Sequence, residues 1–404
     1  MNFLQVISKA VIMASPLIRL SHISLQVSSS QKIITDLVTK YQFRPLAARG
    51  LDGRARRQTV LGNGRVVFIV NENSPEVPRN CSLLYDSPLP SPFPDTACNV
   101  SYEVEDVPGL CRFLTKEGCH LLVPPTELHD YAGSVSYCVV KSVLGNVNHT
   151  LIDRTRYAAP FLPGFQLLEN DPVATGDLSH VDHITYCLPR GTMPRVIEWY
   201  RRCFGFQHFP LSKEEDPKHG LEISGSQIGL RLLSMECPGQ TEVGKIVMVE
   251  SLPQQGINQI DQFLQHHQAG GIQHIGLSTR DIFKAVGSWT EHGVHFAAQP
   301  PSYYTDPHKQ AEILHAGLIP QQLCPFGILL DSSTENQELT ATNKKVLLQV
   351  FTEPLFSKDS VYLELIERRG AQGFGEGNIR ALWRSMQDMM DELSCKEQEE
   401  ALTQ

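Results

Sequence analysis

The sequence lacks the features that mark several common classes of protein. Its 404 residues contain no apolar run near the roughly 18 residues that would span a bilayer, so no transmembrane segment is expected. The 10 cysteines are too dilute for a disulfide framework and form no C-x-x-C pair, which favours reduced thiols over a zinc module. Basic residues are not in surplus, because the formal net charge is -9, and a nucleic-acid partner is therefore not expected.

Acidic residues are absent from the start of the chain. The first carboxylate is Asp36, whereas the preceding segment carries Lys9 and Arg19. An acid-poor, amphipathic start suits a short mitochondrial presequence, which we place at residues 1–16, and it predicts a location in the mitochondrion. The alternative is a frayed tail or a first strand.

The composition is otherwise that of a globular protein with more than one module. Hydrophobic residues make up 41% of the chain and charged residues 20%, which is enough apolar surface to build sizeable cores. A single core stops growing well below this length, so two or more modules are expected.

Distant segments of the chain read alike. Residues 105–125 align with residues 280–301, and each predicts a helix opened by an acid, a Gly stop and a strand ending in Pro. Residues 19–27 align with 180–188 and place His22 over His183. Such repeats predict a tandem duplication.

We expect each half to contain two units that open with a strand followed by a helix. The predicted openers are residues 20–27, 97–104, 181–188 and 272–278. The predicted segments are an N-terminal half at 17–156, a linker at 157–177, a C-terminal half at 178–377, and a helix capped by Asn378 followed by a tail at 378–404.

One trio of side chains in the C-terminal half has the composition of a metal site. In VYLELIER, Glu364 lies on a strand face whose other members are apolar, so its carboxylate needs a cationic partner or a metal. His183 and His274 stand at the starts of two other strands. Two imidazoles and one carboxylate form the facial triad of non-haem iron(II) proteins, and the alternative is a set of satisfied core or surface residues. The corresponding N-terminal positions read His22, Asn99 and Thr150.

A second group of candidates follows in the same half. In KKVLLQVFTEP, Gln349 and Phe351 share one strand face, which suits a pocket for a planar polar substrate or a core strand with one bonded Gln. The Gly-rich loop 370–378 is not a dinucleotide loop, because too little chain follows to complete a βαβ unit.

The motifs VDHI, GGIQHIGL, LLQVFT, YLELIER and QGFGEGNIRALW resemble those of the 4-hydroxyphenylpyruvate dioxygenase family, in the same order along the chain. The resemblance implies an α+β fold, the vicinal oxygen chelate or glyoxalase/bleomycin-resistance-like fold. In this fold four βαβββ units form two tandem open-barrel halves, here with a C-terminal helix added. It also implies that His183, His274 and Glu364 bind Fe(2+), while the N-terminal half holds no metal.

The same resemblance implies roles for further residues. Phe351 and Phe374 match an aromatic pair that sandwiches the substrate ring, and together with Gln349 they are the predicted catalytic set. Leu232 and Glu250 stand near positions where the family has a serine and an asparagine that place the phenol end. The predicted substrate-binding residues are Gln259, Gln273, Gln349, Phe351, Phe374, Asn378 and Glu250.

The resemblance implies an Fe(II)-dependent oxygenase whose partners are an aromatic 2-oxo acid and O2. We expect 4-hydroxyphenylpyruvate to lose CO2 and to be hydroxylated at the benzylic carbon, giving 4-hydroxymandelate, a candidate ring precursor for ubiquinone. The alternatives are ring hydroxylation to homogentisate, a metal-free binding or scaffold module, and a glyoxalase-type zinc or nickel isomerase. Assembly as a homo-oligomer stays open.

Overall fold

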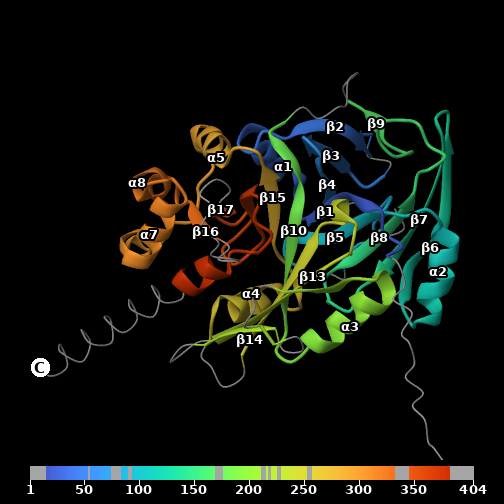
Figure 1. Ribbon diagram of the computed structural model, residues 1–404. Helices are drawn as coiled ribbons and strands as arrows, with labels where there is room; N and C mark the ends of the chain where they lie inside the picture. Colours follow the sequence, from blue (N-terminus) through green and yellow to red (C-terminus); the bar gives the residue numbers. More distant parts are fainter. Residues whose placement is uncertain are drawn as a thin grey trace, which may run out of the picture.

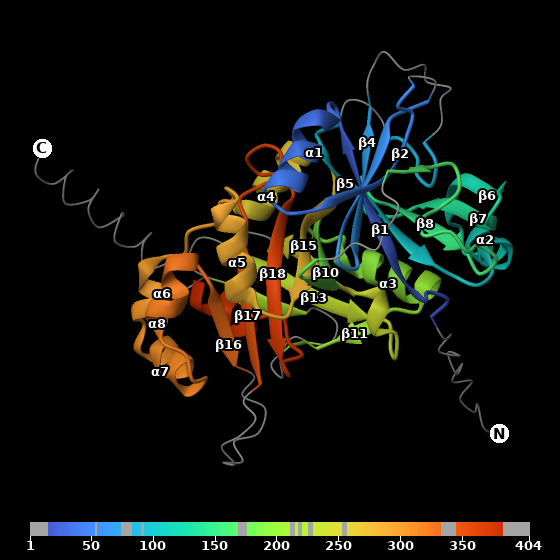
Figure 2. The ribbon, with the colours of Figure 1, turned by 90° about the horizontal axis from the view of Figure 1, so that it is seen from above.

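The protein is described by a computed structural model (Figure 1), which covers residues 15–52, 55–73, 83–89, 93–168, 176–210, 215–216, 220–224, 229–252, 257–332 and 345–382. Two large, curled β-sheets lie side by side, and helices cover their outer faces (Figures 1 and 2). Each sheet belongs to one half of the chain, as the internal repeats predict.

The N-terminal sheet has the strand order β6-β7-β8-β5-β1-β4-β3-β2-β9. Its elements are β1 (Arg19–Val27), α1 (Ser30–Thr39), β2 (Arg44–Arg49), β3 (Gln58–Asn63), β4 (Val66–Glu72), β5 (Thr96–Glu103), α2 (Val107–Lys116), β6 (His120–Asp130), β7 (Gly133–Lys141), β8 (Asn148–Asp153) and β9 (Gln166–Leu167).

The C-terminal sheet has the order β11-β13-β14-β10-β15-β18-β17-β16, and β12 pairs with β13. The first elements are β10 (Leu178–Leu188), α3 (Met193–Phe204), β11 (Gln207–Phe209), β12 (Leu221–Ser224), β13 (Gly229–Glu236), the 3-10 turn η1 (Thr241–Val243), β14 (Lys245–Ser251) and α4 (Gln259–His267). The remainder are β15 (Gly271–Thr279), α5 (Ile282–Glu291), α6 (Pro301–Thr305), α7 (Pro307–His315), α8 (Pro320–Leu323), the 3-10 turn η2 (Cys324–Phe326), β16 (Leu329–Ser332), β17 (Val346–Phe351) and β18 (Tyr362–Arg369).

Strand pairing confirms the prediction of four βαβββ units. In each unit the first strand pairs in parallel with the last, as in β1 with β4, β5 with β8, β10 with β14, and β15 with β18. The two units of a half meet through their first strands, which run antiparallel as β1 with β5 and β10 with β15. The chain therefore has the vicinal oxygen chelate fold.

The repeated segments share their helix starts but differ afterwards. Asp106 caps α2 by accepting from the Gly109 N–H at 2.8 Å, and Asp281 caps α5 by accepting from the Lys284 N–H at 3.0 Å. The prediction of a strand that ends at Pro301 is wrong. The residues between α5 and α6 form only an isolated β-bridge, at Phe296, before α6 begins. Proline has no N–H for a sheet, but it fits the first turn of a helix.

The two halves share one hydrophobic core. Helix α3 of the C-terminal half packs against β8 of the N-terminal half, where Tyr200 Oη lies 2.8 Å from His149 Nε2. On the other side, the rings of Tyr41 and Trp289 meet edge to face at 5.1 Å. Buried side chains of both halves form a single cluster, so the halves support each other.

Two boundaries differ from the prediction. The segment expected as a linker, 157–177, contains β9, which pairs with β2 and extends the N-terminal sheet. The final helix begins at Glu376, so the prediction of Asn378 as its cap is wrong. The part of the predicted helix and tail beyond residue 382 lies outside the described residues. Among the described residues, no helix is long and apolar enough to span a membrane.

Candidate metal centre

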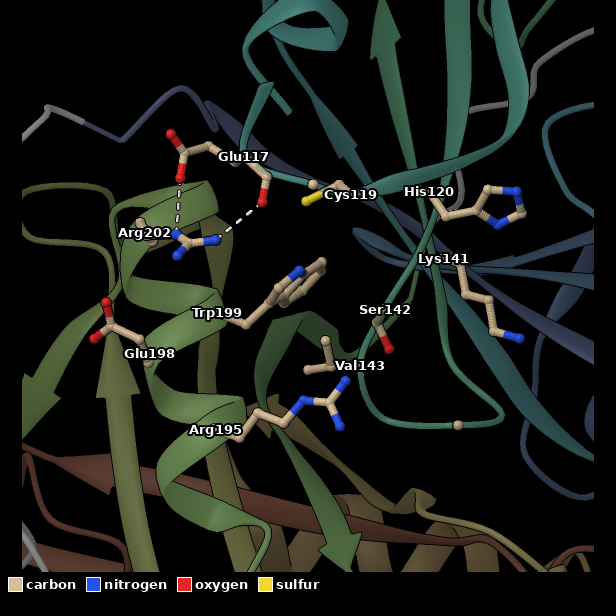
Figure 3. Close-up of a pocket in the computed structure, with 12 residues that line it drawn as sticks. Glu117, Cys119, His120, Lys141, Ser142, Val143, Arg195, Glu198, Trp199 and Arg202 are labelled. Atoms are coloured by element: carbon tan, nitrogen blue, oxygen red, sulfur yellow. Dashed lines mark hydrogen bonds and ion pairs between the residues drawn. The ribbon is translucent and has the colours of Figure 1, made fainter. Parts of the chain in front are cut away.

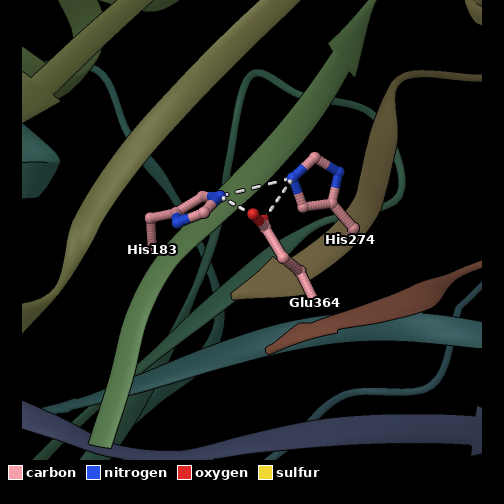
Figure 4. Close-up of side chains that lie close together, drawn as sticks. All are labelled: His183, His274 and Glu364. Atoms are coloured by element: carbon pink, nitrogen blue, oxygen red, sulfur yellow. Dashed lines mark hydrogen bonds and ion pairs between the residues drawn. The ribbon is translucent and has the colours of Figure 1, made fainter. Parts of the chain in front are cut away.

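Three strands of the C-terminal sheet bring the predicted metal ligands together. His183 lies on β10, His274 on β15 and Glu364 on β18 (Figure 4). The two imidazole Nε2 atoms are 3.3 Å apart, and Glu364 Oε2 lies 3.2 Å from His183 Nε2 and 3.4 Å from His274 Nε2. Three donor atoms thus converge on one point, as a single ion requires.

Each histidine is preceded by an extra residue in its strand. The pairing of β10 with β15 shifts between Val181 and His183 and again between Thr185 and Tyr186, which leaves Asp182 and Gln273 as bulge residues. His183 Nδ1 lies 3.1 Å from Asp182 Oδ1, and His274 Nδ1 lies 3.1 Å from Gln273 Oε1. Each bulge residue therefore accepts from Nδ1 of the following ring and leaves its Nε2 free.

Asp182 is itself held by Arg368, which donates from Nε at 2.6 Å and from Nη2 at 2.8 Å. Burial would raise the pKa of Asp182, but Arg368 and His183 outweigh it and hold this pKa below its usual range. Arg368 also donates to the Gly373 carbonyl, which connects the ligand shell to the loop that carries Phe374.

The charges at the centre favour a cation. Burial alone would lower the pKa of His183, but Glu364 and Asp182 raise it to about 9. The pKa of His274 lies well below its usual value, mainly because the ring is buried and also because His183 is nearby. The two shifts have opposite directions, and the raised pKa of His183 reflects the negative charge of Glu364 and Asp182, which would also attract a metal cation.

The second oxygen of Glu364 is held by a chain of buried amides. Gln349 Nε2 donates to Glu364 Oε1 at 3.0 Å, and Asn378 Nδ2 donates to Gln349 Oε1 at 2.9 Å. Asn378 Oδ1 in turn accepts from Tyr303 Oη at 2.6 Å and from Lys309 Nζ at 3.4 Å. This chain fixes the carboxylate so that Oε2 faces the two histidines.

Aromatic and apolar side chains border the centre. Phe374 meets the His183 ring edge to face at 5.2 Å, and Phe351 meets the His274 ring at 6.0 Å. Phe374 belongs to a buried apolar cluster that also contains Leu232 of β13 and Val249 of β14, which pair directly. One side of the centre is therefore an apolar wall.

Two predicted substrate-binding residues are not brought to the centre. Glu250 lies on the opposite face of β14 from Val249; it accepts from Arg231 Nη1 at 3.0 Å and from the Met193 N–H at 3.2 Å. Gln259 is exposed in the first turn of α4. Gln273, Gln349 and Asn378 do lie at the centre, and their contact with substrate stays a prediction.

Four residues of this site were not predicted from the sequence: Asp182, Arg368, Tyr303 and Lys309. Two signals were available for the first pair: Asp182 directly precedes a ligand, and Arg368 shares the strand face of Glu364. Tyr303 and Lys309 come from the helical segment α6–α7, which has no counterpart in the other units, so no repeat could point to them.

The N-terminal half has the same positions filled by side chains that bond one another. His22 Nε2 lies 2.9 Å from Ser101 Oγ, and Asn99 Nδ2 donates to Thr150 Oγ1 at 2.8 Å. Thr150 Oγ1 also donates to the Tyr85 carbonyl at 2.8 Å. These partners satisfy the buried polar groups without an ion.

Paired βαβββ units around two histidines and one carboxylate define a vicinal oxygen chelate protein with a candidate metal centre in its C-terminal half. The profile of the Glyoxalase/Bleomycin resistance protein/Dioxygenase superfamily matches residues 180–314. A 4-hydroxyphenylpyruvate dioxygenase-like protein of Mus musculus is 40% identical over 93% of this chain and 98% of the mouse protein.

More distant relatives are similar over almost the same length. The 4-hydroxyphenylpyruvate dioxygenase of Yarrowia lipolytica is 28% identical over 91% of this chain and 90% of its own. A solved structure of a triple mutant of 4-hydroxymandelate synthase from Streptomyces coelicolor matches with a TM-score of 0.74 and 25% identity, over 93% of this chain and 99% of the other. The chain belongs to the 4-hydroxyphenylpyruvate dioxygenase family.

Proposed function

We propose that this protein is a non-haem Fe(II) oxygenase that converts 4-hydroxyphenylpyruvate and O2 into 4-hydroxymandelate and CO2. The observation that carries the choice of product is the apolar wall in which Leu232 and Val249 pack in one cluster with Phe374. Support for the substrate class comes from the relatives, which are named for 4-hydroxyphenylpyruvate or 4-hydroxymandelate.

The donor set fits iron. His183, His274 and Glu364 offer two nitrogens and one oxygen from one side, which suits an ion that keeps positions open for substrate. Asp182 and Gln273 hold the Nδ1 atoms, so only Nε2 of each ring faces the ion. When bound, Fe(II) would supply the activation of O2 and the chelation of the 2-oxo acid that lead to loss of CO2.

The chain's own residues would then hold and aim the substrate. Phe374, on the loop after β18, and Phe351, on β17, border the two histidines and can stack on an aromatic ring. Gln349, fixed by Asn378, keeps the Glu364 carboxylate in one orientation. Because an error of about 1 Å can cost a hundredfold in rate, this fixed shell would determine how precisely the substrate is aimed.

The wall favours the benzylic carbon over the ring. A phenol hydroxyl placed against Leu232 and Val249 gains no hydrogen bond from these two side chains and would be costly to bury there. Ser251, at the end of β14, already donates to Asn258 Oδ1 at 3.0 Å, and Asn258 donates to the Gly229 carbonyl. The ring is thus held less deeply, and the benzylic carbon beside the 2-oxo acid lies nearest the metal.

The experiment is a product assay. Iron-loaded protein is incubated with 4-hydroxyphenylpyruvate and O2, and the isomeric products are separated by chromatography. We expect 4-hydroxymandelate as the main product, with one O2 consumed per CO2 released. Homogentisate as the main product would overturn the benzylic assignment. A protein that binds no iron and consumes no O2 would instead be a binding or scaffold module.

We also propose that the protein acts in the mitochondrion, where 4-hydroxymandelate could feed a ring precursor of ubiquinone. The support is the acid-poor start of the chain at residues 1–16. The test fuses residues 1–16 to a fluorescent reporter and compares it with the same segment carrying Lys9→Glu. Import of the first fusion alone is expected, and equal cytosolic signal from both contradicts the assignment.

A further inference from the structure

A pocket lies between the two halves, away from the candidate metal centre (Figure 3). Its volume is about 560 Å³, and its walls come from the turn between α2 and β6, the loop between β7 and β8, and helix α3. It shares no residue with the metal centre. A space of this size takes a small metabolite rather than a single ion.

The pocket has unpaired positive charge. Its two acids already have partners, since Glu117 pairs with Arg202 at 2.8 Å and Glu198 with Arg201 at 2.8 Å. Within the part of the chain that the structure describes, Lys141 and Arg195 form no ion pair. Figure 3 shows Arg195 reaching from α3 toward the β7–β8 loop, on the side away from Glu198. The lining therefore suits an anionic ligand.

Two thiols meet at this pocket, one from each half. Cys119, in the turn after α2, lines the pocket and is partly exposed. Cys203, in the last turn of α3, is 1% exposed, and its Sγ lies 3.4 Å from Cys119 Sγ. A small rotation of the side chains would bring the sulfurs to bonding distance.

The surroundings give the two thiols different roles. The pKa of Cys119 is lowered to about 7, mainly by the hydrogen bond from Cys203. Trp199 and the charge of Arg202 act in the same direction, and burial opposes them. The same bond and burial raise the pKa of Cys203. Cys119 is thus the thiol that faces the pocket and whose thiolate is favoured by its neighbours, as an attacking group requires.

The other described thiols provide a contrast. Cys111 and Cys138 also share a hydrogen bond, but both are buried and neither lines the pocket. Cys324 is exposed and stands outside the pocket. Among these described thiols, Cys119 and Cys203 are thus the pair that combines close sulfur atoms with an accessible thiol in a pocket lined by cationic side chains.

We propose that this pocket binds a small anionic disulfide, and that Cys119 and Cys203 exchange with it to form a disulfide across the two halves. The Cys119 thiolate attacks one sulfur of the ligand R–S–S–R, the S–S bond breaks, and one thiolate leaves with the proton that Cys119 lost. The Cys203 thiol then attacks Cys119 Sγ, the mixed S–S bond breaks, and the proton of Cys203 goes to the leaving thiolate, which is released as the second thiol. Two protein thiols are oxidised, and one disulfide is reduced to two thiols.

The test uses the full-length protein and glutathione disulfide, a peptide disulfide with several carboxylates. After reaction, free thiols are alkylated and the digest is examined by mass spectrometry. We expect a Cys119–Cys203 cross-linked peptide from the wild type, one glutathionyl group trapped on Cys119 in Cys203→Ser, and neither in Cys119→Ser. Cys324→Ser should behave as the wild type, and far-UV circular dichroism verifies the fold of each variant.

A second arm tests the cationic lining. In Lys141→Gln/Arg195→Gln the reaction with glutathione disulfide should slow by about tenfold at low ionic strength, while the reaction with uncharged hydroxyethyl disulfide should not change. Equal slowing with both disulfides, or none with either, overturns the anion site. Labelling of Cys324 or of Cys111 as fast as Cys119 overturns the assignment of the exchanging pair.

Discussion

The two halves have the same backbone irregularities but different side chains where the metal ligands lie. In the C-terminal half, the bulge residues Asp182 and Gln273 precede the ligands. In the N-terminal half, the pairing of β1 with β5 shifts at the equivalent places, at Ser21 and Cys98. Ser21 Oγ even lies 3.2 Å from His22 Nδ1, as Asp182 does from His183. The bulges are thus a property of the fold and do not by themselves make a metal site.

The difference lies in what surrounds each histidine. Burial lowers the pKa of His22 to about 3, so this ring stays neutral, and it is satisfied by Ser101. His183 lies between two carboxylates that raise its pKa to about 9. Because Thr150 stands at the position of Glu364, the N-terminal cluster has no carboxylate directly on its histidine.

The largest expected effect is that of Glu364→Gln compared with Thr150→Val. The first change removes the ligand charge but keeps the bonded shape beside Gln349, and we expect iron content to fall to background and turnover to fall by at least about a hundredfold. The second should leave the iron content at one ion per chain. Metal analysis and O2 consumption measure both, and retained turnover in Glu364→Gln would refute the ligand assignment.

The next effect compares the bulge residues that directly precede His183 and His22, which are Asp182 and Ser21. In Asp182→Asn the partner of His183 Nδ1 loses its charge, and Arg368 loses a buried ion pair. Iron affinity should fall by about 10- to 100-fold, measured by competition with a chelator. Ser21→Ala, at the matching N-terminal position, should not change it. Equal loss in both variants would mean that Asp182 acts through the fold alone.

The sequence predicts the duplicated fold from its internal repeats, and it predicts the trio of His183, His274 and Glu364 from strand alternation at Glu364 and from the family motifs. It fails at bulges: an extra residue turns Asp182 and His183 toward the same centre, and alternation alone would separate them. Glu250 shows the converse. Alternation along β14 places it on the outer face with Arg231, whereas the family match had assigned it to the substrate.

Helix α4 and the C-terminal helix show a different limit. Gln259 and Asn378 both stand in first turns, yet one is exposed and the other is 1% exposed and bonded to Gln349 and Tyr303. The side-chain direction in a first turn depends on where the helix begins, and a shift of one or two residues rotates it by 100° per residue. Local sequence cannot decide this, because the contacts that select the start come from distant segments such as α6.

A moderate effect is expected from the buried His22 of the N-terminal half, which should make the folded protein sensitive to acid. The pKa of His22 is lowered on folding, so the unfolded chain binds a proton that the folded chain does not as pH falls below about 6.5. Stability is therefore fully present above this pH and declines toward pH 3, by about 1.4 kcal/mol per pH unit for one such group. In His22→Gln this slope should be smaller by that amount, as urea unfolding of the metal-free protein between pH 6.5 and 4.5 would show. His129→Gln, at an exposed site, should keep the wild-type slope, and an unchanged slope in His22→Gln would contradict the buried neutral state.

The smallest expected effect concerns the interiors of the two barrels. In the N-terminal half Tyr85 and Tyr137 fill the interior ring to ring at 4.5 Å, whereas in the C-terminal half Leu232 and Val249 leave an apolar wall beside Phe374. Leu232→Ser supplies a hydroxyl that can bond the phenol end, so a deeper ring should shift part of the product from 4-hydroxymandelate to homogentisate. Leu232→Ala is the matched control, because it removes the same bulk without a hydroxyl. If both variants give the same product ratio, the space at this wall rather than its polarity selects the carbon that reacts.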